Sequence, residues 1–100
     1  METDFDYKGF MTDFAIADRF GEPAVRDTYN RAFAEWKDNV DYFASLVMVL
    51  NHRLWMWYRS EEPRADRMAH LYDELWRKAD EWGCSHFKGK DAEYYFRFLD

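Results

Sequence analysis

The residue types that most often carry chemistry are few in this sequence and lie far apart. The three histidines, His52, His70 and His86, fall in three different predicted elements. None of them has the i, i+4 histidine partner or the histidine and glutamate spacing with which zinc enzymes assemble their ligands. The sequence therefore predicts neither a metal site nor a bound cofactor.

Cys84 and His86 are the one pair that could supply a nucleophile and a general base. Two loop residues so close in sequence seldom reach hydrogen-bond distance together with a third orienting group, so we expect an unreactive thiol. The sequence also lacks a glycine-rich phosphate loop, a G-x-S-x-G turn and a pair of carboxylates isolated in an apolar run. These patterns predict a protein that is not an enzyme.

Aromatic residues make up 21% of the chain, which is more than a core of this size needs. After Leu54, residues 55–58 place four large side chains in a row on a helix, and one helix face cannot bury them all. We therefore expect Trp55 or Tyr58 to lie at the margin of the core or outside it. Exposed Trp and Tyr near arginine are typical of the energetic centres of protein interfaces, unless the terminal segments fold over these rings.

Acidic residues outnumber basic ones, and the formal net charge is −6. Residues 1–41 hold ten acidic and five basic residues, so this part carries most of the excess. Such a charge repels phosphate backbones and favours basic protein surfaces, so direct nucleic-acid binding is not expected. The leading acids are candidates for contact with a basic partner; they are Glu2, Asp4, Asp6, Asp13 and Asp18. A solvated tail is the favoured interpretation of the first three.

A second row of acids, Asp66, Asp73 and Asp80, recurs every seven residues on one face of a later predicted helix. Residues seven apart lie on the same side of a helix, so these carboxylates could present a negative face to a partner. Arg77 lies among them and neutralises much of the row. We retain the three aspartates, with Trp55 and Tyr58, as candidate partner-binding residues.

These side chains must be positioned by helices, because the hydrophobic pattern repeats every three to four residues along most of the chain. We expect an all-α fold, a compact bundle of four or five helices forming a single domain over residues 1–100. Residues 1–11 alternate charged and aromatic residues, so an irregular segment is predicted there. Thr12 then caps a short helix that Gly21 ends, and Pro23 begins the next.

The helical periodicity runs unbroken through residues 24–60. One helix of about 36 residues would be roughly 54 Å long, which exceeds the size of a compact 100-residue domain. We therefore predict a break at Asp38 or Asn39, while the unbroken phase leaves a single helix open. Nearly every residue from Tyr42 to Leu50 is apolar, so this helix should be the centre of the bundle.

Two more helices are predicted after this central one. Pro63 begins a helix with a clean apolar stripe that ends at Gly83, and Asp91 caps a last short helix. No apolar run is long enough to cross a membrane, no secretory leader is recognisable, and Cys84 has no partner for a disulfide. A cytoplasmic protein, monomeric or homodimeric, is expected.

The segment from Ile16 to Arg31 offers a different functional interpretation. A short helix, Gly21 and a proline-led helix follow one another as in a helix-turn-helix motif. The second helix carries three basic side chains, but the carboxylates of Asp27 and Glu35 would be repelled by the DNA phosphates, which weakens binding. The alternative hypothesis is therefore a DNA-binding accessory regulator of a mobile element.

Three segments carry a resemblance to known proteins: residues 27–36, residues 46–52 and residues 71–76, within a region of about two thirds of the chain. They resemble small, acidic, uncharacterised proteins of bacterial conjugative elements and phages. This resemblance implies a protein that counters host defence by binding a restriction enzyme or a CRISPR nuclease. Our leading hypothesis is accordingly a non-catalytic inhibitor of the anti-CRISPR or anti-restriction type, acting in the bacterial host by occluding a basic nucleic-acid-binding groove.

Overall fold

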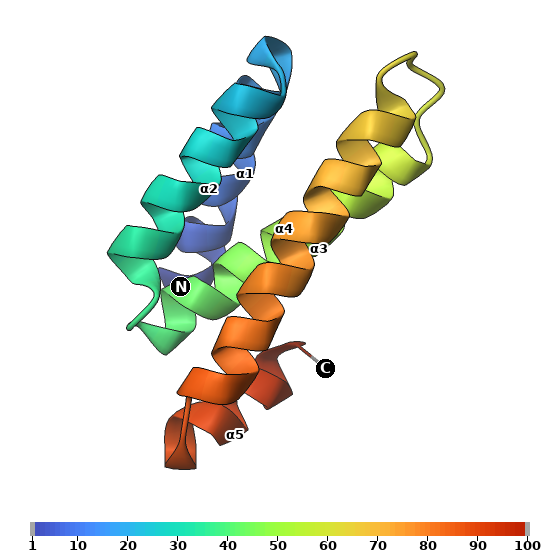
Figure 1. Ribbon diagram of the computed structural model, residues 1–100. Helices are drawn as coiled ribbons and strands as arrows, with labels where there is room; N and C mark the ends of the chain where they lie inside the picture. The colour runs from blue at the N-terminus through green and yellow to red at the C-terminus, as the bar shows by residue number, and fades with distance from the viewer. Residues whose placement is uncertain (1, 100) are drawn as a thin grey trace.

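The structure, a computed structural model, describes the backbone of residues 2–99 and the side chains of residues 7–98. This part of the chain is all-α, as predicted, and forms five helices (Figure 1). They are α1 (Glu2–Phe20), α2 (Glu22–Trp36), α3 (Val40–Tyr58), α4 (Ala65–His86) and α5 (Gly89–Leu99). Among the described residues, no helix combines the length and apolar character that a membrane span requires.

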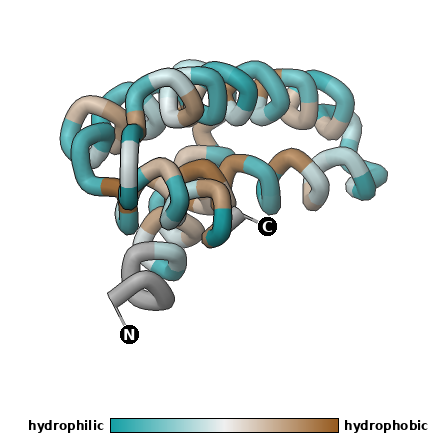
Figure 2. The backbone as a smooth tube through the Cα atoms, turned by 90° about the horizontal axis from the view of Figure 1, so that it is seen from below, coloured by the Kyte–Doolittle hydropathy of each residue, from teal (hydrophilic) through white to brown (hydrophobic). Residues whose placement is uncertain are grey.

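Helix α3 is the centre of the bundle, as its apolar sequence predicted. It packs against each of the other four helices, and α1 and α2 lie side by side as an antiparallel pair (Figure 1). Seven of its apolar side chains are buried, from Phe43 through Leu50 to Trp57. Seen from below, the most hydrophobic stretch of backbone lies in the middle of the molecule (Figure 2).

The predicted break between α2 and α3 is confirmed. Helix α2 ends at Trp36, and the side-chain Oδ1 of Asn39 accepts a hydrogen bond from the backbone N–H of Tyr42 at 3.2 Å. This bond satisfies one of the orphan amides at the start of α3. The break lets the chain reverse, so the longest dimension is 43 Å, less than a single uninterrupted helix would require.

The first helix begins earlier than the sequence indicated. Residues 1–11 were expected to be irregular, whereas α1 begins at Glu2 and continues through Thr12. The reason is a helical pattern hidden beneath the alternation of charged and aromatic residues. Phe10 and Phe14 are buried one turn apart, and Tyr7 packs against the same core. Packing of this stripe against α3 overrides the weak local pattern.

Helix α4 does not end at Gly83, contrary to the sequence prediction, but continues to His86. A glycine is required at position 83 because α5 approaches the backbone of α4 closely there. A Cβ atom at this position would lie 2.8 Å from Cζ of Tyr95 and 3.0 Å from Cε2 of Phe43. The glycine therefore lets the Tyr95 ring of α5 dock directly on the backbone of α4. Helix α5 begins at Gly89, two residues before the predicted cap at Asp91.

Aromatic rings fill one end of the bundle. Phe43 lies between 5.1 and 6.2 Å, centroid to centroid, from the rings of Phe33, Trp82, Phe87 and Tyr95. Pairs at these distances and tilted angles are favourable beyond their buried area. This cluster accounts for part of the aromatic excess. Other aromatic rings are exposed on the surface, among them Phe20, Trp55, Tyr58 and Phe96.

Candidate partner-binding surface

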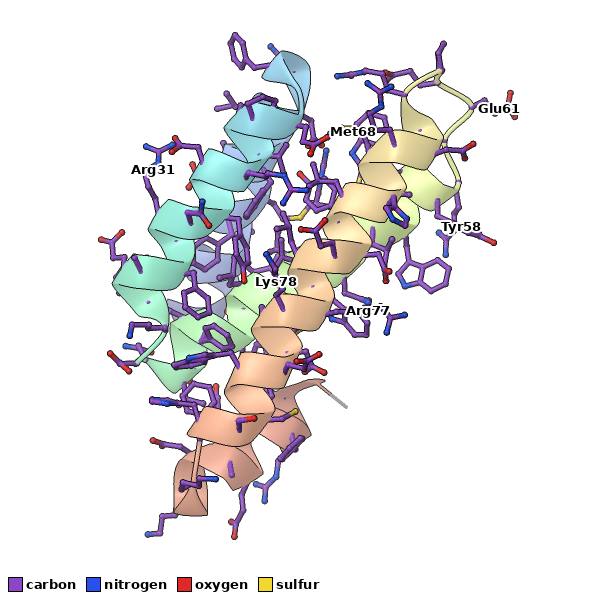
Figure 3. All side chains as sticks on the ribbon, viewed as in Figure 1. Arg31, Tyr58, Glu61, Met68, Arg77 and Lys78 are labelled. Atoms are coloured by element: carbon purple, nitrogen blue, oxygen red, sulfur yellow. The ribbon has the colours of Figure 1, made fainter. Side chains whose placement is uncertain are left out.

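A groove lies between α3 and α4, and we call it the α3–α4 groove. Its volume is about 790 Å³. Its lining consists of Asn51, Leu54, Trp55 and Tyr58 from α3 and Asp66, Ala69, His70, Asp73, Trp76 and Arg77 from α4. Tyr58 and Arg77 are on the same side of the molecule (Figure 3). The structure thus brings together four predicted site residues: Trp55, Tyr58, Asp66 and Asp73.

Trp55 and Tyr58 form an exposed aromatic pair. They are three residues apart on α3 and therefore share a face, with ring centroids 5.4 Å apart at an interplanar angle of 72°. Trp55 is 46% exposed and Tyr58 is 70% exposed, which confirms that these rings lie outside the core. Contact between the two rings restricts both of them, so the pair is partly ordered.

The opposite wall of the groove carries charge. Both carboxylate oxygens of Asp73 accept a hydrogen bond from Nε of Arg77, each at 3.1 Å, and the guanidinium of Arg77 lies 5.8 Å from the centre of the Trp76 ring. Asp66 is exposed and takes part in no ion pair among the described side chains. The groove therefore combines an aromatic wall with one free and one paired carboxylate.

Asp80 does not join this groove, although it continues the seven-residue spacing of Asp66 and Asp73. It accepts a hydrogen bond from the Tyr95 hydroxyl at 2.7 Å and so links α4 to α5. Position 80 lies about 21 Å along the helix from Asp66 and is rotated by about 40° from it, which places it beyond the end of the groove. Burial and the bond to Asp80 raise the pKa of the Tyr95 phenol.

Asp18, predicted as a partner-binding acid, is buried and does not belong to an acidic surface. Its Oδ2 accepts hydrogen bonds from Nη2 of Arg53 and, at 3.0 Å, from Nε1 of Trp57. Its Oδ1 accepts a 2.5 Å hydrogen bond from the Tyr72 hydroxyl. Burial and this bond raise the pKa of the Tyr72 phenol, which remains a neutral donor.

We call Asp18 and the three side chains that donate to its carboxylate, Arg53, Trp57 and Tyr72, the Asp18 cluster. This cluster fixes the relative position of the two helices that form the α3–α4 groove. Trp57 belongs to α3 and Tyr72 to α4, and both donate to one carboxylate on α1. Arg64 adds a fourth contact, because its Nη1 donates to the backbone oxygen of Asp18 at 2.8 Å. A buried carboxylate with several charge-assisted hydrogen bonds has few alternative positions, so it sets the spacing of α3 and α4.

Sequence reasoning missed the burial of Asp18 and Arg53, yet a signal is present. Asp18 lies four residues after the buried Phe14, and Arg53 lies four residues before the buried Trp57. Each charge therefore falls within the apolar stripe of its own helix, where an isolated charge would be costly. Two opposite charges on two such stripes indicate a buried ion pair.

Asp13 lies away from the α3–α4 groove. Asp13 is exposed on α1 and lines a separate groove between α1 and α2. The side chains of Glu2, Asp4 and Asp6 are outside the described residues. The acidic arm predicted from the sequence is therefore divided: Asp18 is interior and Asp13 is on the surface.

Cys84 and His86 contact different partners. The Cys84 thiol lies 3.9 Å from Oδ1 of Asp80, and burial together with that carboxylate raises the pKa of the thiol. His86 stacks on Trp82 at 4.0 Å and places its Nε2 3.3 Å from Asp38. This arrangement disfavours the thiolate that a cysteine nucleophile needs. Within the described residues, no three His, Cys, Asp or Glu side chains are arranged to hold a metal ion.

The basic residues of α2 are engaged with carboxylates. Arg26 forms ion pairs with Glu22 at 2.9 Å and with Glu74 of α4 at 2.8 Å, and the bond from Arg26 lowers the pKa of Glu74. Arg31 lies 3.3 Å from Asp27. Contact with DNA phosphates would have to compete with these pairs. Comparison of the chain with protein-family models, curated proteins and solved structures finds no match.

Proposed function

We propose that this protein is a non-catalytic inhibitor that binds a host defence nuclease of the CRISPR or restriction type and covers its basic nucleic-acid-binding surface. One observation carries the proposal. Trp55 and Tyr58, both exposed, face the carboxylates of Asp66 and Asp73 across a single groove. Aromatic anchors beside acceptors suit a surface that presents arginine and lysine side chains.

The physical roles of the two walls differ. The Trp55 and Tyr58 rings offer a large apolar area, and their faces attract arginine guanidinium groups through cation–π contact. Asp66 can accept hydrogen bonds from an incoming guanidinium where a phosphate would otherwise do so. The net charge of −6 adds long-range attraction to a basic surface and speeds association.

The test is a cleavage assay on purified CRISPR effector nucleases and restriction enzymes, with increasing amounts of the wild-type protein. We expect inhibition of at least one of them that saturates near equimolar protein and is strongest when the protein is added before the DNA. The proposal fails if every nuclease remains fully active at large molar excess. Retention of bare DNA at low salt, lost on Arg26→Ala with Arg31→Ala, would instead favour the DNA-binding regulator.

A further inference from the structure

A second groove lies on the outer side of the helix pair α1 and α2, and we call it the α1–α2 groove. It has a volume of about 430 Å³. It is hollow because small side chains form its floor, with Ala17 on α1 and Ala24 and Ala32 on α2. Arg31, which lines this groove, lies on the opposite side of the molecule from Tyr58 (Figure 3). The two grooves are therefore separate surfaces.

Two large, solvent-exposed apolar side chains border this groove. Ile16 is 52% exposed and Phe20 is 76% exposed, and both line the groove. They lie four residues apart on α1, so they form a continuous apolar ridge one turn long. A solvent-exposed Phe and Ile beside a hollow of alanines are features of a docking surface.

The rim of the α1–α2 groove is acidic. Asp13 projects from α1, and Asp27 and Glu35 project from α2, against a single lining base, Arg31. Arg31 is paired with Asp27 at 3.3 Å. Asp13 and Glu35 form no ion pair with any described side chain. Each helix thus contributes an unneutralised carboxylate to the rim.

We infer that the α1–α2 groove binds a basic amphipathic helix of a partner protein. From Ala24 to Glu35 the groove follows α2 for about 16 Å at 1.5 Å per residue, the length of roughly three helical turns. Apolar residues of the ligand at i, i+3 or i+4, and i+7 pack on Ile16, Phe20 and the alanine floor. Its lysine and arginine residues meet Asp13 and Glu35. Charge complementarity selects this occupant over an acidic or neutral helix.

The probe is a fluorescein-labelled peptide of 14 residues with leucine at helical i, i+3, i+4 and i+7 positions and lysine elsewhere, titrated with the protein and followed by anisotropy. We expect saturable one-to-one binding. Ile16→Ser with Phe20→Ser should weaken it by about tenfold or more, and Asp13→Lys with Glu35→Lys should do the same. The matched controls lie outside both grooves at exposed positions: Phe96→Ser for the apolar change and Glu61→Lys with Glu93→Lys for the charge change. They should leave the affinity unchanged.

Three outcomes would overturn the inference. The first is the absence of saturable binding, and the second is equal binding of a peptide in which serine replaces every leucine, which would reduce the interaction to net charge. The third is a protein dimer that Phe20→Ser dissociates, because the groove would then belong to a second copy of this chain. All the substituted side chains are exposed, so circular dichroism should report an unchanged fold. The nuclease assay is independent of these outcomes.

Discussion

The hydroxyl of Tyr72 in α4 lies 2.5 Å from Oδ1 of Asp18 in α1, although 54 residues separate them in sequence. The same carboxylate also accepts hydrogen bonds from Arg53 and Trp57 of α3. One buried acid thus joins three helices, and two of them form the walls of the α3–α4 groove. The shape of the proposed binding surface therefore depends on this buried contact, because it holds α3 and α4 in place.

Asp18→Ala should destabilise the protein strongly. The change leaves the buried guanidinium of Arg53 without its partner and removes the acceptor of Trp57 and Tyr72. Breaking a buried pair in this way costs about 3–5 kcal/mol in free energy of unfolding. Urea denaturation measures it. The control is Asp13→Ala, an exposed acid on the same helix, which should change stability by no more than about 0.5 kcal/mol; equal effects would contradict a buried Asp18.

Gly83→Ala should also be destabilising, because the added methyl group would lie 2.8 Å from the Tyr95 ring. Overpacking of this kind costs about 1–3 kcal/mol. Gly9→Ala is the matched control, since Gly9 lies within α1 and a Cβ there meets nothing within 4 Å. That variant should gain up to about 1 kcal/mol from helix propensity. Thermal melts of both variants measure the difference, and a stabilised Gly83→Ala would contradict the close approach of α5.

Stability should fall in alkaline solution because buried tyrosine phenols, Tyr72 and Tyr95 among them, are held neutral. Burial and hydrogen bonds to carboxylates raise the pKa of Tyr72 and Tyr95 in the folded state. Above the unfolded pKa of about 10, the unfolded chain loses these protons while the folded chain keeps them. The stabilisation is thus complete below about pH 10 and is lost as the pH rises further. Urea denaturation from pH 8 to 11 should show this decline.

Tyr95→Phe tests the origin of that decline. The variant removes one of the buried phenols that remain neutral in the fold, so its stability should decrease less steeply above about pH 10 than that of the wild type. Tyr58→Phe is the control, because Tyr58 is exposed. Identical alkaline profiles for the wild type and Tyr95→Phe would show that the Tyr95 phenol does not contribute.

The helices could be predicted from sequence wherever the hydrophobic periodicity agreed with the positions of capping and helix-breaking residues. Asn39 illustrates this, because the length of an uninterrupted helix favoured a break at Asp38 or Asn39, and the Asn39 side chain forms the cap. Gly83 illustrates the opposite case. A glycine that ends a helix and a glycine that admits a neighbouring ring look alike in sequence, and only the position of Tyr95 distinguishes them. Asp18 was misplaced for a similar reason, since its partners are 35 to 54 residues away.

The members of the candidate site could be predicted one by one, but their grouping could not. The crowded run around Trp55 required exposed rings, and the spacing of Asp66 and Asp73 required a shared helix face. That these two features border the same groove depends on the rotation of α3 against α4. Long-range contacts, including the Asp18 cluster, set this rotation, and Asp80 shows how two further turns of helix lead to a different surface.

The most direct test of the proposed inhibitor is displacement of fluorescently labelled target DNA from a purified nuclease that the protein inhibits, followed by anisotropy. Wild-type protein should displace the DNA, and Trp55→Ala with Tyr58→Ala should weaken displacement about tenfold or more while the melting temperature is preserved. Phe96→Ala removes an exposed aromatic ring of α5 outside the groove and should displace DNA as the wild type does. Equal displacement by the wild type and the Trp55 and Tyr58 double variant would contradict binding through the α3–α4 groove.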